Sequence, residues 1–385
     1  MVTPFEFATA TRIVFGNGRA AELPAIAREF GQRPLVVTGS NAARSKPLLD
    51  ALRQNHFSPT LFLVAGEPAI ALVQSGAEWA CSAKCDCVIS IGGGSVIDAG
   101  KAIAALATNR GEAVDYLEVI GKAQPLSEAP LPFIAVPTTA GTGAEVTRNA
   151  VLHSPEHRLK VSLRSPRLLP RVALVDSELT HELPPALTAS TGMDALTQLI
   201  EPFVSNRANP ISDALCREAV PRVARSLRSA FENGADAAAR HDMALASLFG
   251  GLALASAGLG AVHGFAAPIG GMFTAPHGAV CAALLADVMQ TNVQEAQKQK
   301  ATEVTRRYNE VARLLTGVAT ARANDGVQWI RALCRDLQIS RLRALGIQRG
   351  NFPDLCEKAL NSSSMKGNPL PLTVIQLSEI LERAC

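Results

Sequence analysis

The first half of the chain alternates short apolar runs with longer amphipathic segments. Four runs predict buried strands, at residues 33–38, 60–65, 87–91 and 133–136. Segments with helical periodicity separate the first three runs. Strands that are apolar on both faces and joined by helices form parallel sheets, so we predict a doubly wound, mostly parallel α/β sheet.

Two further segments have a strand-like pattern. Residues 151–163 hold a turn-like Ser154-Pro155 between two short strand-like pieces, which predicts a β-hairpin near the edge of the α/β domain. Residues 5–15 predict an N-terminal strand, and this strand is a candidate for pairing with a second copy of the chain.

The strand signal ends near Asp176. From Pro184-Pro185 onward the chain is a series of Ala- and Leu-rich segments, broken at residues 206–210, 233–234 and 258–278. A chain of 385 residues also exceeds the size of a single hydrophobic core. We therefore predict an α/β domain over residues 1–178 and an all-α domain over residues 179–385.

Composition narrows the classes of partner. The 37 basic and 34 acidic residues are spread along the chain, so we expect a small-molecule substrate and no nucleic acid. Eight cysteines without a secretory leader predict reduced thiols in the cytoplasm. Residues 244–262 are uncharged and long enough to span a membrane, but they are rich in Gly and Ala, so we predict a buried helix and no membrane.

The run Ile91-Gly-Gly-Gly-Ser-Val-Ile-Asp98 follows a predicted strand and opens a predicted helix. Glycines let backbone amides approach a phosphate, and a helix N-terminus adds positive potential there. Ser95 is the predicted N-cap, with Asp98 completing a capping-box arrangement. The run is not the G-x-G-x-x-G fingerprint, so a tight turn without a ligand remains the alternative.

A second polar loop, residues 137–147 (PTTAGTGAEVT), directly follows another predicted strand. Hydroxyls and glycines at the carboxyl end of a parallel strand can contact phosphate and ribose. A solvated Thr-rich turn is the alternative, and the presence of two such loops on one sheet favours binding.

Asp194 and Gln198 are four residues apart, so on a helix they share one face. His263 and His277 flank a Gly/Pro-rich break and can converge from two elements. A carboxylate with two imidazoles suits a divalent metal with open positions for substrate. Two unrelated core or surface histidines are the alternative.

Five segments, in order along nearly the whole chain, resemble the motifs of the iron-containing (group III) alcohol dehydrogenases, a family that includes the maleylacetate reductase branch. They are GGGSVIDAGK, PTTAGTGAEVT, GMDALTQLIE, AVHGFAAPIGGMFTAPHG and SSMKGNPLPLT, and the early TRIVFGNG also fits. The resemblance implies a dehydroquinate synthase-like architecture, with a dinucleotide-binding domain, a helical domain, and cofactor and metal in a cleft between them. It also implies a homodimer.

The resemblance implies roles for individual residues. The pyrophosphate and ribose would be held by Gly93, Gly94, Ser95, Thr138, Thr139 and Thr142, with Asp98 and Thr147 in the same motifs. Asn149 and Lys160 would lie near the nicotinamide. Asp194, His263 and His277 would be metal ligands and, together with Lys160, the catalytic residues.

Two positions depart from the family pattern. Gln198 stands where the family has a histidine ligand, so we expect a weak or absent fourth ligand and a lower metal occupancy. Ala267 stands where the family has a histidine beside the nicotinamide, so the proton path must differ. Four outcomes follow: a three-ligand or Gln-assisted site, a different metal such as zinc in place of iron, a metal-free reductase, or loss of activity.

The residues after the predicted strand at 33–38 bear on cofactor choice. An acidic residue there would bind the ribose 2′-hydroxyl of NAD and repel the 2′-phosphate of NADP. This chain has Gly39 and Ser40, which leave room and offer a donor, with Arg44 as a possible charge partner. We therefore expect NADP to be accepted at least as well as NAD.

The sequence predicts an NAD(P)-dependent oxidoreductase that transfers a hydride between nicotinamide and a small alcohol, aldehyde or ketone, with help from a metal. A metal-independent, maleylacetate-reductase-like carbonyl reductase is the first alternative. A non-catalytic dinucleotide-binding protein is the second, and the retention of Asp194, His263 and His277 argues against it.

Overall fold

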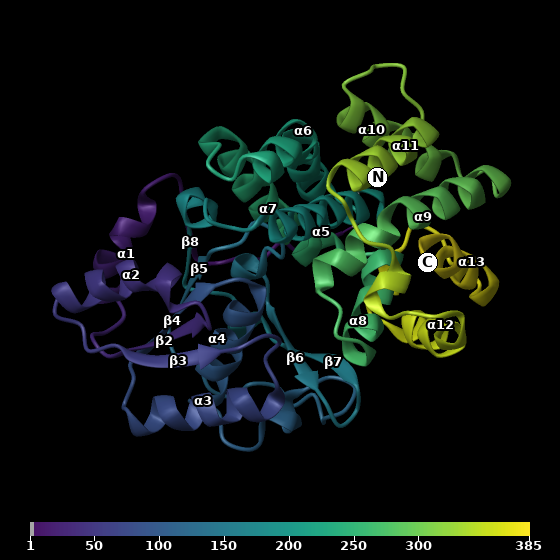
Figure 1. Ribbon diagram of the computed structural model, residues 1–385. Helices are drawn as coiled ribbons and strands as arrows, with labels where there is room; N and C mark the ends of the chain where they lie inside the picture. The colour runs from purple at the N-terminus through teal and green to yellow at the C-terminus, as the bar shows by residue number, and fades with distance from the viewer. Residues whose placement is uncertain (1–3) are drawn as a thin grey trace. The chain divides into compact units, whose positions relative to one another are not determined.

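The computed structural model describes residues 4–385, apart from the side chain of Ala42. The chain divides into two compact units (Figure 1). The α/β unit comprises Ala8–Thr139 and Gly143–His181, and the helical unit comprises Ala140–Thr142, Glu182–Cys385 and the described residues before Ala8. Compactness does not test independent folding, so the division into two domains at residue 178 stays a prediction.

The α/β unit is built on a six-stranded sheet in which every neighbouring pair is parallel. Its spatial order is β1 (Arg12–Phe15), β8 (Val172–Val175), β5 (Phe133–Pro137), β4 (Cys87–Gly92), β2 (Pro34–Gly39) and β3 (Thr60–Val64). The four strands first predicted from the sequence all occur, with bounds shifted by one residue or less. The predicted doubly wound parallel sheet is confirmed.

Helices cover both faces of the sheet, and alternate strand residues point to each face. Leu35 and Val37 pack in one core with helices α3 (Ile70–Ser82) and α4 (Gly94–Leu106). Val36 packs in the other core with α1 (Leu23–Arg28) and α2 (Ala42–Gln54). Burial on both faces explains why these strands are continuously apolar in sequence.

The strand order creates a switch point between β2 and β4. From β2 the chain moves outward to β3, then returns to place β4 on the other side of β2. The connections after β2 and β4 therefore leave in opposite directions, and such points hold ligands at the carboxyl ends of the strands. The polar loops predicted to bind cofactor begin at this edge.

The predicted hairpin is present as β6 (Asn149–Ser154) and β7 (Leu159–Arg164), which pair antiparallel.

Two predictions about the edge of the large sheet are wrong. The short run at β8 was not recognised as a strand, and the predicted strand at 5–15 is reduced to β1. Its partner β8 has only four residues, and before Arg12 the backbone pairing continues among the described residues only as one hydrogen bond, from the N–H of Thr11 to the carbonyl of Pro170 at 3.0 Å. Pairing of the N-terminal segment with a second copy stays a prediction.

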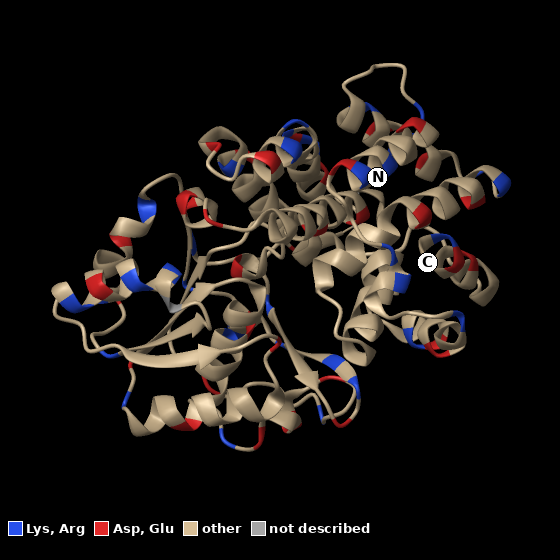
Figure 2. Ribbon diagram, in the orientation of Figure 1, with Lys and Arg blue, Asp and Glu red and all other residues tan. Residues whose placement is uncertain are grey.

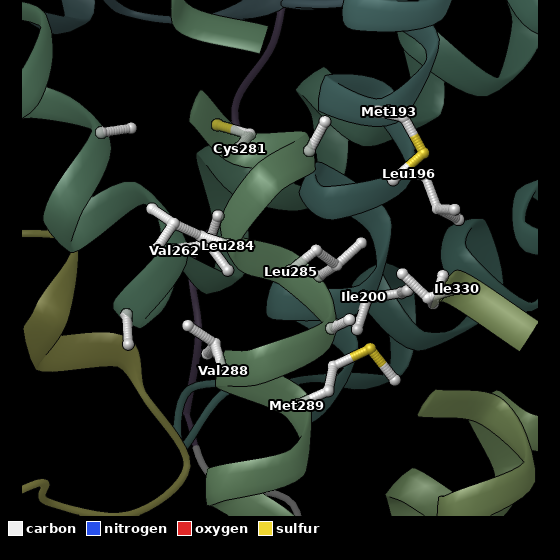
Figure 3. Close-up of a cluster of buried hydrophobic side chains, with 14 of the residues drawn as sticks. Met193, Leu196, Ile200, Val262, Cys281, Leu284, Leu285, Val288, Met289 and Ile330 are labelled. Carbon is white, nitrogen blue, oxygen red and sulfur yellow. The ribbon is translucent and has the colours of Figure 1, made fainter. Parts of the chain in front are cut away.

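The helical unit is all-α among its described residues, as predicted. Its helices are α5 (Pro185–Val204), α6 (Pro210–Glu232), α7 (Ala237–Ala257), α8 (Ala261–Met272), α9 (His277–Lys298), α10 (Thr302–Thr316), α11 (Ala323–Asp336), α12 (Phe352–Asn361) and α13 (Val374–Ala384). One apolar core joins them, and Figure 3 shows its centre, where Leu196 and Ile200 of α5 lie near Leu285 of α9.

Two predictions in this unit are wrong in detail. The predicted single helix at 244–262 ends at Ala257, because Gly258 adopts a φ of 72° that other residues rarely adopt. The predicted break at 258–278 is largely the helix α8, which contains Pro268.

No single helix among the described residues is long and apolar enough to cross a membrane. Helices α7 and α8 reach the necessary length and hydropathy only together, as a pair that is bent by 100°.

Charged side chains of both signs are interspersed over both units (Figure 2). This distribution agrees with the near balance of 37 basic and 34 acidic residues.

Candidate active site

Gly93 and Gly94 stand at the junction of β4 and α4. Gly93 is the N-cap of α4 and has an extended backbone, and among the described residues no side chain caps this helix end. The predicted N-cap role of Ser95 is therefore wrong, because the helix begins one residue before it at Gly94. A helix N-terminus without a side-chain cap leaves its amides available to an anion.

The two predicted cofactor loops lie side by side. Gly92 pairs with Pro137 at the ends of β4 and β5, and Thr138 donates its backbone N–H to the carbonyl of Gly92 at 3.0 Å. A Cβ atom at Gly93 would lie 3.2 Å from Cγ2 of Thr139, tighter than most contacts. Glycine at this position thus lets the threonine loop approach the start of α4. Thr142 belongs to the helical unit.

A third loop at this edge of the sheet begins with Gly39, the last residue of β2, and Ser40. A Cβ atom at Gly39 would meet only Cγ2 of Val96, at an ordinary 3.8 Å. Asn41 caps α2 by accepting the backbone N–H of Ala43 at 3.2 Å. The position where relatives of the predicted class place an acidic residue is therefore open to a larger side chain.

Lys101 of α4, not identified as a site residue from the sequence, is fully buried and organises several predicted cofactor residues. Its Nζ donates to Oγ1 of Thr147 and to the carbonyl of Asn149, both at 2.9 Å, and lies 3.5 Å from Oδ1 of Asp98. Asp98 Oδ2 in turn accepts the backbone N–H of Val151. Asp98 and Thr147 thus tie the hairpin β6–β7 to α4, and this structural role accompanies their predicted cofactor role.

Lys160, predicted near the nicotinamide, lies on β7 of the hairpin. Its side chain is almost buried, and its Nζ lies 2.8 Å from Oε1 of the more exposed Glu67. Asn149 begins the same hairpin on β6. The hairpin therefore holds Asn149 and Lys160 on one small sheet, attached to α4 through Lys101.

The predicted metal residues converge in the helical unit. Nε2 of His263 lies 3.4 Å from Oδ1 of Asp194, and Nε2 of His277 lies 3.7 Å from the same oxygen. The two imidazole rings have centroids 5.3 Å apart. With Sγ of Cys281, these atoms all lie within 4.8 Å of one another. The two histidines are therefore not independent residues.

Close packing of three helices produces this convergence. Asp194 lies on α5, His263 on α8, and His277 is the first residue of α9. A Cβ atom at Gly278 would lie 2.3 Å from the carbonyl oxygen of Ser190, one turn before Asp194. Only glycine allows α9 to start against α5, and so the Pro-His-Gly sequence places His277 beside Asp194.

Glu201, one turn after Gln198 on α5, orients His263. Its Oε2 lies 2.7 Å from Nδ1 of His263, and its Oε1 accepts the backbone N–H of Val262 at 2.7 Å. A carboxylate only accepts hydrogen bonds, so Nδ1 carries a proton, and Nε2 is the ring atom that faces Asp194 and would be free to bind a cation once deprotonated. This arrangement is typical of imidazoles that bind metals.

The site holds buried polar atoms that lack hydrogen-bond partners in the described part of the chain, namely Oδ1 of Asp194 and Oε1 of Gln198. Both side chains are nearly inaccessible to water, at 1% and 3% exposure. Buried polar groups are normally paired, and a carboxylate oxygen left alone beside two imidazoles fits a bound cation. The residues present therefore suit a divalent metal.

The charges of the cluster are interdependent. Burial alone would raise the pKa of Asp194, but His277 and His263 lower it overall. Burial would lower the pKa of His263, yet Cys281, Asp194 and Glu201 raise it well above its usual range. Burial would raise the pKa of the Cys281 thiol, and the same two histidines lower it. The two histidines thus favour the ionised forms of Asp194 and Cys281.

Cys281 and Glu201 were missed in the sequence. Cys281 lies four residues after His277, a spacing that puts both side chains on one face of α9. That spacing was a usable signal, and so was the position of Glu201, which ends the GMDALTQLIE motif and lies seven residues after Asp194, on the same face of α5. Ala267 lies one turn after His263 on α8 and is partly exposed.

Comparison with known proteins agrees with this geometry. The model of the family described as "Iron-containing alcohol dehydrogenase" matches residues 10–177, and "Fe-containing alcohol dehydrogenase family, C-terminal" matches residues 188–385. Alcohol dehydrogenase 4 of Saccharomyces cerevisiae is 37% identical over 318 residues, covering 82% of this chain and 80% of the yeast protein.

Solved structures match over nearly the full length. A crystal structure of 1,3-propanediol oxidoreductase superimposes with a TM-score of 0.92 at 32% identity and covers 100% of both chains. Sulfoacetaldehyde reductase from Bifidobacterium kashiwanohense, solved in complex with NAD+, gives a TM-score of 0.87 at 29% identity over 99% of each chain.

Proposed function

Because the chain belongs to the iron-containing alcohol dehydrogenase family, we propose that it interconverts a small alcohol and its aldehyde or ketone with NAD(P), assisted by one divalent metal. The chain is an oxidoreductase of alcohols and aldehydes, and its family implies NAD(H) and a divalent metal. The identity of the metal, the preference between NAD and NADP, and the residues in each role are parts of the proposal.

One observation carries the metal assignment. Asp194, His263 and His277 come from three helices and meet around an unpartnered carboxylate oxygen within the described residues. This oxygen accepts no well-formed hydrogen bond, although two imidazole nitrogens lie 3.4 and 3.7 Å from it, and a cation bound among the three groups would satisfy it. We propose these three residues as ligands, with Gln198 at most a weak one.

A bound divalent metal supplies a Lewis acid that polarises the substrate oxygen, and the nicotinamide supplies or accepts the hydride. In this scheme Asp194 provides negative charge, and His263 and His277 provide neutral nitrogen donors. Glu201 fixes the tautomer of His263 through its 2.7 Å contact. The low exposure of Asp194 and His263 keeps water away from the ligands.

For the cofactor we propose that the amides at Gly93, Gly94 and Ser95 hold the pyrophosphate, with Thr138 and Thr139 beside them. The uncapped helix end and the adjoining threonine loop support this assignment. Asn149 and Lys160 of the hairpin would approach the nicotinamide, and Gly39 with Ser40 would receive the ribose. The absence of an acid at position 39 supports use of NADP as well as NAD.

The names of the relatives given above refer to an alcohol, to 1,3-propanediol and to sulfoacetaldehyde, which supports a small alcohol or aldehyde as the substrate here. We further propose that the chain works in the cytoplasm as a homodimer. The unpaired cysteines support the first point. The family resemblance supports the second.

A metal-independent carbonyl reductase is the second candidate. Two observations favour it: Gln198 is a poorer ligand than the expected histidine, and Ala267 removes an imidazole that the family pattern places near the nicotinamide. An activated substrate would reduce the need for Lewis-acid assistance.

Oxidation of NADH and of NADPH with a panel of short aldehydes and ketones tests the proposal, with metal content measured on the same samples. The proposal expects turnover in preparations that hold metal and a loss of turnover in parallel with metal. Equal turnover without metal would favour the second candidate. No turnover with any carbonyl, despite cofactor binding, would favour a non-catalytic protein.

A further inference from the structure

We propose that the thiolate of Cys281 is a ligand of the metal, occupying the coordination position that Gln198 fills poorly. The inference rests on the proposed function, because it requires a metal at Asp194, His263 and His277. It adds a fourth donor of a different chemical kind, and it changes which metal the site should prefer.

Geometry is the first support. Sγ of Cys281 lies 3.9 Å from Nε2 of His263 and 3.8 Å from Nε2 of His277. In a tetrahedral zinc site, ordinary bond lengths separate sulfur from nitrogen by about 3.6 Å, and nitrogen from oxygen by about 3.3 Å. The sulfur contacts and the Asp194 contacts at 3.4 and 3.7 Å each agree with these values to within about 0.4 Å.

The orientation of the thiol is the second support. Cys281 is completely buried, and Figure 3 shows it at the edge of the apolar cluster around Leu284 and Leu285. A buried cysteine usually packs as a small apolar group. Here Sγ instead faces two imidazole nitrogens and lies near an unpartnered carboxylate oxygen in the described residues. That is an arrangement of donors around a common centre.

The other thiols of the chain serve as an internal comparison. Among the contacts of the described residues, the sulfurs of Cys81, Cys334 and Cys385 approach backbone carbonyls. Cys216 is as buried as Cys281 but belongs to no group of possible metal ligands. Within the described residues, Cys281 is the cysteine placed among metal-ligating side chains.

A thiolate would offset what the site loses at Gln198. Gln198 offers a neutral amide oxygen, whereas a thiolate is a charged, soft donor that binds Zn²⁺ strongly and suits Mg²⁺ or Mn²⁺ poorly. With Asp194 it would bring two negative charges to a divalent cation. The low metal occupancy expected from Gln198 in place of a histidine then no longer follows, and zinc becomes the preferred metal.

The substrate position remains available. Most catalytic zinc sites keep a fourth position open for substrate, and some expand to five ligands during the reaction. Four protein donors therefore do not exclude a carbonyl oxygen. The exposed side of His277, whose side chain is 31% accessible, is the open side of the cluster.

Cobalt spectroscopy of the full chain tests the inference without an activity assay. We would remove metal with a chelator, add one equivalent of Co²⁺, and record the near-ultraviolet and visible spectra. Thiolate bound to Co²⁺ gives a charge-transfer band in the near ultraviolet, and cobalt itself gives visible bands whatever its ligands. The inference expects both sets of bands in the unmodified protein, so its main outcome needs no substitution.

Variants identify the sulfur. Cys281→Ser should abolish the near-ultraviolet band while visible cobalt bands persist, and zinc affinity should fall by roughly 10-fold or more, since even loss of a group that supports a ligand costs about 10–100-fold. The matched buried control Cys216→Ser should keep the band, as should Gln198→Ala.

The outcomes separate the inference from the proposed function. Visible cobalt bands without a charge-transfer band, or a band that persists in Cys281→Ser, would overturn the role of Cys281 and leave the three-ligand metal intact. Failure of the unmodified protein to bind cobalt or zinc at all would overturn the metal-assisted function together with this inference.

Discussion

Oε2 of Glu201 lies 2.7 Å from Nδ1 of His263, and the other oxygen of the same carboxylate accepts the backbone N–H of Val262. Both residues that Glu201 contacts belong to α8, so one buried carboxylate fixes the helix and the ring that it carries. His263 is consequently held with Nε2 toward Asp194 before any ligand arrives. Such preorganisation is the usual function of groups behind metal ligands.

Replacing Glu201 by glutamine should weaken metal binding by about 10–100-fold, as losses of supporting groups at metal sites typically do. The amide presents one oxygen in place of two, so it can accept from Val262 or from His263 but not from both. Metal affinity from competition with a chromophoric chelator measures the effect. Unchanged affinity in Glu201→Gln would show that the ring needs no such support.

Replacing Gly39 by aspartate should shift cofactor preference toward NAD. A carboxylate about 4 Å from the 2′-phosphate would cost between about 1 and 4 kcal/mol, so the ratio of kcat/KM for NADPH over NADH should fall by about fivefold or more. Gly39→Ala is the steric control, because a Cβ atom there makes only an ordinary contact with Val96. A strong preference for NAD in the unmodified protein would contradict the account of this loop.

Glu145 should make the stability of the α/β unit depend on pH. Burial raises the pKa of Glu145 to about 7, from a usual value of 4.5, while Lys101 acts to lower it. The folded protein therefore holds this proton more tightly than the unfolded chain. Its contribution to stability is complete below about pH 4.5 and is lost as the pH rises through about 7.

Glu145→Gln should remove this dependence. The stability lost between pH 5 and pH 8 should be smaller than in the unmodified protein by roughly 2 to 3 kcal/mol, the part of the pKa shift that falls within this range. Urea unfolding at the two pH values measures it. The exposed Glu128→Gln serves as the matched control and should retain the original slope. An identical slope in Glu145→Gln would mean that the carboxyl is not the responsible group.

His277→Ala should abolish metal retention and carbonyl reduction while NAD(P)H binding stays within about twofold. His277, the proposed metal ligand, is the first residue of α9 in the helical unit, whereas the proposed cofactor loops lie in the α/β unit. Metal analysis after dialysis and fluorescence titration with NADPH measure the two properties separately. Retention of stoichiometric metal would exclude His277 as a ligand, and loss of cofactor binding would indicate general disruption.

The sequence predicted those parts of the fold that depend on local pattern. Strands such as β2 and β4 are apolar on both faces, and so they stand out as short runs bounded by turn residues. β8 has the same composition but only four residues, which is too short for periodicity to distinguish. Gly258 ends α7 inside the uncharged run 244–262 through its backbone conformation, which the apolar pattern of that run does not reveal. Pro268 lies inside α8, where the Gly/Pro-rich composition had suggested a break.

The candidate site was predictable where a residue type and a motif coincide, as at Asp194, His263 and His277. It was not predictable where a role depends on packing. Lys101 lies in a recognised motif, but its contacts with Thr147 and Asn149 come from the way the hairpin lies against α4. Glu201 also lies in a recognised motif, but its contacts with Val262 and His263 come from the approach of α8 to α5.

Reconstitution of chelated protein tests the central claim, that a metal held by Asp194, His263 and His277 assists the reduction. NADPH oxidation with a short aldehyde would be measured as Zn²⁺ is added in steps from zero to above one equivalent per chain. The account predicts negligible reduction in metal-free protein and a linear rise that ends at one equivalent, with no rise in His277→Ala. Metal-free protein that reduces the aldehyde at the untreated rate would contradict it.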